Sequence, residues 1–126
     1  MFTPDRAFSG FSVDDTEAAR RFYGDVLGLE VGLNEMGFLE IGLGSGARVL
    51  AYEKPNHEPA SFTILNFPVA DVEAAVDDLN SRGVVTKIYT DPDFGTDERG
   101  ILRGGGGPDI AWFTDPAGNV LSVLKV

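Results

Sequence analysis

The sequence contains no cysteine, and it has one histidine and one tryptophan among 126 residues. Without cysteine, the chain can form neither disulfide bonds nor thiolate metal sites. No apolar run approaches the roughly 20 residues that a membrane helix needs, and the first residues lack the apolar region of a signal peptide. The sequence therefore predicts a cytoplasmic protein without a membrane partner.

Basic residues are also scarce, because 20 Asp and Glu stand against 10 Lys and Arg, for a net charge of −10. A field of this sign repels a phosphate backbone, and no basic cluster counters it locally, so nucleic acid is not an expected partner. The hydrophobic fraction is 43%, with nine Phe, which is ordinary for a folded chain. At this length we expect one domain, covering residues 1–126.

The chain contains an internal repeat. The segment Val13-Asp14-Asp15-Thr16-Glu17-Ala18-Ala19 lies 56 residues before Val69-Ala70-Asp71-Val72-Glu73-Ala74-Ala75, and five of the seven positions are identical. Each segment follows a strand-like run and begins a helical pattern. We interpret this as a duplication, with module one at about 1–54, a linker at 55–60 and module two at about 61–126.

The same local signals mark both helices. Asp15 and Asp71 are suitable N-caps, because a short carboxylate accepts hydrogen bonds from the free backbone N–H groups of the first turn. Gly28 and Gly83 suit the left-handed residue that ends a helix.

Strand-like segments follow each helix and precede it. They are expected at 7–13, 29–33, 38–43 and 48–52 in the first module, and at 62–69, 84–89, 110–114 and 119–125 in the second. The order β-α-β-β-β, repeated twice, predicts an α+β fold. In this fold the two modules form a cupped mixed sheet with one helix per module on the outer face.

The segment 91–108 is long for a connection, and long loops in compact domains often cover binding sites. Its glycine run, 104–107, has two interpretations. A phosphate cradle would need a lysine and a helix start after the glycines, and neither follows. The context favours a flexible loop, in which charged residues such as Asp97, Glu98 and Arg99 are solvated.

Several motifs in this order resemble the vicinal oxygen chelate superfamily, which includes glyoxalase I, extradiol dioxygenases, fosfomycin resistance enzymes and bleomycin resistance proteins. The resemblance covers nearly the whole chain. It is carried by Val13-Asp14-Asp15, Ala19-Arg20-Arg21-Phe22-Tyr23, Leu27-Gly28-Leu29, the segment from Val69 to Ala75, Leu79, Arg82-Gly83-Val84 and Phe113-Thr114-Asp115-Pro116-Ala117-Gly118-Asn119. It implies a small-molecule site in the cup and a homodimer.

Enzymes of that superfamily bind a divalent metal through His, Glu or Gln from four strands. The resemblance places these ligand positions at Phe8, Leu50 (or a neighbour), Ile64 and Ser122. None of these side chains binds a divalent ion strongly. The resemblance thus supports the fold and argues against a metal or another cofactor.

An unusual metal site is the open alternative. Glu40, Glu53 and His57 are its candidate ligands. A Glu on a strand is more often solvated than bound to a metal, and His57 stands in a Pro-flanked linker that we expect to lie on the surface. With one His and no Cys, no Ser-His-Asp or Cys-His set is expected. The sequence therefore favours a binding protein over an enzyme.

Period-2 alternation places apolar, aromatic and a few polar side chains on the inner face of the cup. The candidate ligand-binding residues are Phe8, Ser12, Leu50, Tyr52, Ile64, Asn66, Trp112 and Ser122. Such a lining is typical of a small-ligand pocket. A closed core or a dimer seam would produce the same pattern, so both remain alternatives.

The favoured function is therefore a metal-independent small-molecule-binding protein, similar to bleomycin resistance proteins. Its ligand would stack on Tyr52 and Trp112, and an acidic protein would suit a cationic one. The alternatives are a glyoxalase-like lyase or dioxygenase with a non-standard metal site, and a subunit that only dimerises.

Overall fold

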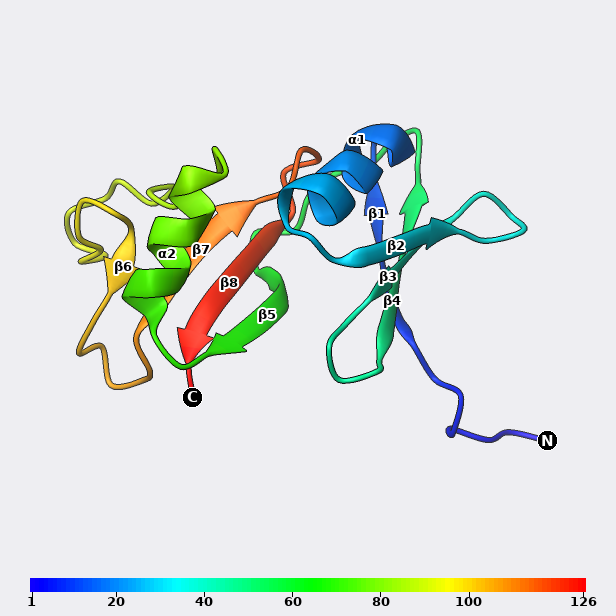
Figure 1. Cartoon of the computed structure of the whole chain (residues 1–126), viewed down its shortest axis with the longest axis horizontal. Coiled ribbons are helices and arrows are strands. Elements are labelled where there is room, and N and C mark those ends of the chain that lie inside the picture. Colours follow the sequence, from blue (N-terminus) through cyan, green and yellow to red (C-terminus); the bar gives the residue numbers. More distant parts are fainter. The chain divides into compact units, whose positions relative to one another are not determined.

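The computed structural model describes residues 1–126, which divide into two compact units, Met1–Pro59 and Ala60–Val126. The boundary lies inside the segment 55–60 that the sequence marks as a linker. The first unit contains β1 (Ser9–Val13), α1 (Thr16–Arg20), the π-helix η1 (Arg21–Val26), β2 (Glu30–Leu33), β3 (Leu39–Gly42) and β4 (Arg48–Glu53). The second contains β5 (Thr63–Val69), α2 (Val72–Ser81), β6 (Ile101–Leu102), β7 (Ile110–Thr114) and β8 (Val120–Lys125) (Figure 1).

Both units have the same topology. The strand order is β1-β4-β3-β2 in the first and β5-β8-β7-β6 in the second. The first strand of each unit pairs in parallel with the last, and the other neighbours are antiparallel. The predicted α+β fold of two βαβββ modules is confirmed, and each module has its own four-stranded mixed sheet. None of the helices has the length and apolarity to cross a membrane.

The predicted helix starts and ends are confirmed. Asp15 accepts hydrogen bonds from the backbone N–H groups of Glu17 and Ala18 at 3.0 and 3.2 Å, and Asp71 accepts one from Ala74 at 3.1 Å. These contacts satisfy donors that a helix cannot pair internally. Gly28 and Gly83 have φ angles of 77° and 84°, the left-handed conformation that ends a helix.

The first helix differs from the regular α-helix that the sequence predicts. From Arg21 it widens into a π-helix, and the N–H of Leu27 bonds to the carbonyl of Phe22, five residues back, at 2.9 Å. The widened turn lies directly against β2, because a Cβ atom at Gly24 would stand only 2.7 Å from Val31 Cγ2. π-turns of this kind are rare and local, so sequence periodicity does not reveal them.

Each unit buries one face of its sheet under its helix. In the first unit the fully buried side chains include Val13, Leu39, Ile41, Ala51 and Tyr23. In the second, α2 packs on β7 and β8, over Ala111, Phe113, Leu121 and Val123 (Figure 1). Because side chains alternate along a strand, every second residue points to the opposite face, and in the first unit that face holds the candidate site.

The segment 84–89 does not form the predicted strand. The edge position beside β7 is taken by β6, whose Ile101 and Leu102 pair with Ala111 and Ile110. Thr86 is 3% exposed and its hydroxyl donates to the carbonyl of Arg99 at 2.6 Å. The segment has the β-branched residues of a strand, but its backbone does not pair with any strand of the sheet. Its side chains, such as Thr86, make the contacts instead.

The long segment 91–108 is tied to the fold through Asp97 and Arg99, which corrects the expectation that these two residues are solvated, whereas Glu98 is exposed as expected. Arg99 forms ion pairs with Glu73 and Asp77 of α2, at 2.7 and 2.5 Å. Burial raises the pKa of Asp97, but hydrogen bonds from the backbone N–H groups of Ile101 and Arg99, and from Arg103, outweigh this effect and keep the pKa below its usual value. A charged Asp97 thus closes the turn that leads into β6.

Candidate functional site

The open face of the first sheet carries a hollow of about 850 Å³, within the range of small-molecule pockets. Its walls come from the residues before β1, from the loop between β2 and β3, and from the β3–β4 hairpin. Leu50 of β4 lines it, and the register neighbours of Leu50 are Gly10 on β1 and Glu40 on β3. The apolar lining includes Phe8, Met36, Phe38, Leu43 and Leu50.

The lining exposes large apolar side chains. Phe8 is 69% exposed and Met36 is 73% exposed, whereas Phe38 and Leu50 are half-buried. A concave apolar surface with a polar rim is typical of a binding site. Of the eight predicted ligand-binding residues, the structure places Phe8 and Leu50 here.

A polar pair stands at the rim of the hollow. Arg48 Nη1 lies 3.2 Å from Glu40 Oε1, and the two side chains are 67% and 38% exposed. Sequence reasoning did not select Arg48, nor did it select Arg6, Met36 and Phe38, which also line the hollow. Alternation could have found Arg48, because it precedes Leu50 by two residues on the same strand. No sequence signal marks the loop residues.

Ser12 and Tyr52 are register neighbours farther along the same face. Ser12 Oγ lies 2.6 Å from His57 Nδ1 and His57 is half-buried, so the expectation that His57 is an exposed surface residue is wrong. The linker turns back, because the N–H of Lys54 bonds to Val13 and the N–H of His57 bonds to Lys54, both at 3.0 Å. The Tyr52 ring is centred 6.2 Å from that of Phe38, which connects it to the wall of the hollow.

The alternative metal ligands of the first unit are not brought together. Glu40 lies on the open face beside Arg48. Glu53 is the partner of Val13 on the helix face and accepts a hydrogen bond from the backbone N–H of Thr16 at 3.0 Å. His57 is engaged with Ser12. The structure contains no group of three or more His, Asp or Glu that could hold a metal ion.

Three predicted site residues of the second unit are also neighbours. Asn66, Ser122 and Trp112 lie side by side on β5, β8 and β7. Ser122 is fully buried and donates to Asn66 Oδ1 at 2.6 Å, and Trp112 Nε1 donates to Thr63 Oγ1 at 3.2 Å. Ile64 falls at a β-bulge and has no register partner, because a bulge adds an unpaired residue to one strand.

The loop of the second unit covers Trp112 with aromatic rings. The centroids of Tyr89 and Phe94 lie 5.3 Å from that of Trp112 and 5.1 Å from each other. Thr96 Oγ1 donates to the carbonyl of Tyr89 at 3.0 Å, which holds the loop in this arrangement. Sequence reasoning placed Trp112 in a pocket but did not identify this packing.

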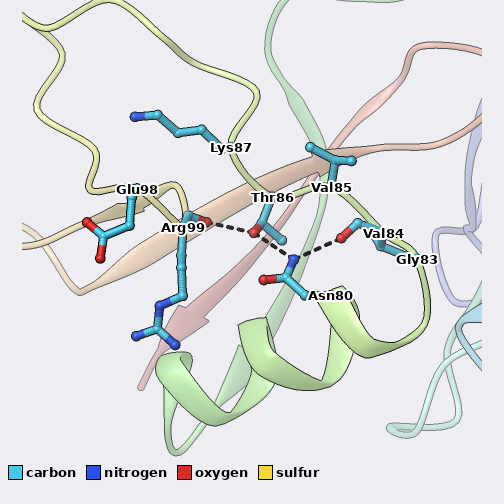
Figure 2. Close-up of a pocket in the computed structure, with 8 residues that line it drawn as sticks. All are labelled: Asn80, Gly83, Val84, Val85, Thr86, Lys87, Glu98 and Arg99. Carbon is cyan, nitrogen blue, oxygen red and sulfur yellow. Dashed lines mark hydrogen bonds between the residues drawn. The ribbon is translucent and has the colours of Figure 1, made fainter.

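A smaller pocket of about 350 Å³ lies at the C-terminal end of α2 (Figure 2). Asn80 Nδ2 donates to the carbonyl of Val84 at 2.9 Å and to Thr86 Oγ1 at 3.1 Å, and Thr86 in turn donates to Arg99 (Figure 2). These polar groups hold the segment 84–87 against the helix and the loop. We therefore interpret the polar groups of this pocket as structural and take the larger hollow of the first unit as the candidate site.

The four positions that the family resemblance assigns to metal ligands carry a donor set that does not fit a divalent cation. Phe8, Leu50 and Ile64 are hydrocarbons, and the hydroxyl of Ser122 donates to Asn66. Divalent metals in proteins are held by imidazole, carboxylate or thiolate groups.

The chain matches the family model of the Glyoxalase/Bleomycin resistance protein/Dioxygenase superfamily over residues 7–123. No curated protein sequence matches it significantly.

Solved structures with the same fold cover nearly the whole chain. A superfamily member from Sphaerobacter thermophilus has a TM-score of 0.69 at 20% identity, covering 95% of this chain and 97% of its own. An antibiotic binding protein from a Streptomyces species has a TM-score of 0.66 at 24% identity, covering 94% of both chains. Lactoylglutathione lyase from Agrobacterium tumefaciens has a TM-score of 0.61 at 23% identity, covering 98% and 95%. At these identities, the likeness establishes the fold alone.

Proposed function

The chain belongs to the Glyoxalase/Bleomycin resistance protein/Dioxygenase superfamily, and from this premise we propose that it is a metal-independent small-molecule-binding protein. The ligand is an apolar or aromatic molecule held in the hollow on the open face of the first sheet. One observation carries this proposal: a cavity of about 850 Å³ is lined by large apolar side chains that remain exposed. The likeness to an antibiotic binding protein supports it at the level of the fold.

The second unit carries another predicted ligand-binding residue, Trp112, outside this hollow. This side chain is half-buried, and its indole N–H is already bonded to Thr63. Stacking of a ligand on Trp112 stays a prediction, and the rings of Tyr89 and Phe94 already pack against the indole. The cytoplasmic location and the homodimer stay predictions. The homodimer is expected from the family resemblance, and light scattering of the purified protein tests it.

Removing the exposed apolar side chains of the hollow is expected to weaken ligand binding. In the double variant Phe8→Ala/Met36→Ala, the Kd for N-phenyl-1-naphthylamine, a neutral fluorescent aromatic probe, should rise about tenfold or more, because two apolar contacts are lost. Both side chains are largely exposed, so the melting temperature should stay close to that of the wild type. Fluorescence titration measures the Kd.

Leu33→Ala is the matched control. Leu33 is 59% exposed, lies on the edge strand β2 and does not line the hollow. Its loss should leave the Kd unchanged. An equal Kd for the wild type and the double variant would refute the proposed site.

We expect the purified protein to contain no stoichiometric metal and its melting temperature to be unchanged by EDTA. This expectation follows from the hydrocarbon side chains at three of the four expected ligand positions and the engaged hydroxyl at the fourth. Elemental analysis and a thermal melt with and without EDTA measure it. Stoichiometric Zn, Ni, Mn or Fe together with an EDTA-sensitive melt would favour the alternative, a glyoxalase-like lyase or dioxygenase.

A further inference from the structure

The charge of the hollow differs in sign from that of the chain. The whole protein carries a net charge of −10, which suggested a cationic ligand. The charged residues that line the hollow, however, are Arg6, Arg48 and Glu40, two cations and one anion. Asp5 and Glu35 adjoin lining residues in the chain, but both are exposed and neither lines the cavity.

Arg48 has the capacity to bind an anion. Its guanidinium group carries five N–H donors in a planar fork that matches a carboxylate. The structure gives it one partner, Glu40 Oε1 at 3.2 Å, and leaves 67% of the side chain exposed. An exposed ion pair of this kind contributes little to stability. The pair therefore leaves most of the donors of Arg48 available at the rim of the cavity.

The position of Arg48 relative to the apolar lining completes the argument. Arg48 and Leu50 are two residues apart on β4, so their side chains lie on the same face of the sheet, about 7 Å apart along the strand. A ligand whose ring packs on Leu50 and Phe8 would thus place a polar group on the edge of that ring within reach of the Arg48 guanidinium. The apolar surroundings strengthen such a contact, because they exclude water from one side of it.

We propose that the hollow selects an apolar or aromatic molecule that carries a carboxylate or a similar oxyanion, and that Arg48 is its specificity-determining residue. This inference rests on the proposed function and adds the charge of the ligand to it. Negative charges that lie farther than about 8 Å from the hollow oppose this contact little, because they are largely screened at physiological salt.

Three isosteric probes test the sign of the charge: 2-naphthoate, 2-naphthalenemethanol and 2-naphthylmethylammonium. By calorimetric titration, the naphthoate should bind most tightly and the ammonium compound most weakly. In Arg48→Gln, the affinity for naphthoate should fall about tenfold, the effect of losing one charge-assisted contact, while the affinity for the neutral alcohol stays unchanged. Glu40→Gln should raise the affinity for naphthoate, because it removes the competing carboxylate.

Arg21→Gln is the matched control for net charge. Arg21 is 63% exposed, has a single ion pair, with Glu17 at 3.7 Å, and does not line the hollow. Its affinity for naphthoate should equal that of the wild type. Tighter binding of the ammonium probe, or equal losses in Arg48→Gln and Arg21→Gln, would overturn the inference and leave the proposed function standing. Failure of all three probes to bind would defeat the proposed function itself.

Discussion

Gly100→Ala is expected to lower the free energy of unfolding by roughly 3 kcal/mol or more. Gly100 has a φ angle of 87°, which an alanine adopts only at a cost. A Cβ atom at this position would also overlap the carbonyl oxygen of Thr86 and lie 2.6 Å from its carbonyl carbon. Because both partners are backbone, relief requires the segments around Thr86 and Gly100 to separate.

Gly37→Ala isolates the steric part of this effect. Gly37 has a nearly equal φ angle of 81°, and a Cβ atom there meets nothing within 4 Å. Only the backbone cost remains, about 1–2 kcal/mol. Urea denaturation of both variants, followed by far-UV circular dichroism, measures the difference. Equal losses of stability would contradict the close packing of Thr86 on Gly100.

Asp115→Ala is expected to lower the free energy of unfolding by about 3–5 kcal/mol. Asp115 is 4% exposed, and its carboxylate accepts hydrogen bonds from the backbone N–H groups of Ala117 and Asn119 at 3.0 and 2.8 Å, and from Asn119 Nδ2 at 3.0 Å. Alanine removes the acceptor of these three hydrogen bonds in a buried turn, and the loss of a buried hydrogen-bond partner costs about 1–3 kcal/mol.

Two variants control for this prediction. Asp115→Asn retains an acceptor oxygen for the backbone donors, so its loss should be clearly smaller than that of alanine. Asp93→Ala removes an exposed carboxylate and should change stability by about 0.5 kcal/mol or less. Urea midpoints of the three variants measure these effects. A loss below about 1 kcal/mol in Asp115→Ala would mean that water satisfies the turn and that the buried network is not required.

These two sites also explain which parts of the molecule the sequence could predict. The turn at Asp115 follows from local chemistry, because the aspartate bonds to residues only two and four positions away. The contact between Gly100 and Thr86 joins segments that are fourteen residues apart, and nothing near either residue announces the other. The failure to predict β6 has the same origin, since the competition for the edge of β7 is decided by packing and not by β-propensity.

In the candidate site, too, some features follow from local sequence and others only from the tertiary structure. Alternation along the strands placed Leu50 and Ser12 on the open face, and the register agrees with this placement. The pairing of Ser12 with His57, however, depends on the linker folding back over the end of β1. The charge of the hollow likewise depends on which three of the thirty charged residues reach its wall, and net charge does not report this.

By itself, the sequence determined the duplicated βαβββ order, the helix caps at Asp15 and Asp71, and the turn at Asp115, because each of these depends on residues a few positions apart. Only the tertiary structure decided that a hollow exists on the open face, that Arg48 and Glu40 stand at its rim, and that Tyr89 and Phe94 cover Trp112. These features join residues distant in sequence, and the packing of the whole unit selects such contacts, not the propensity of any one segment.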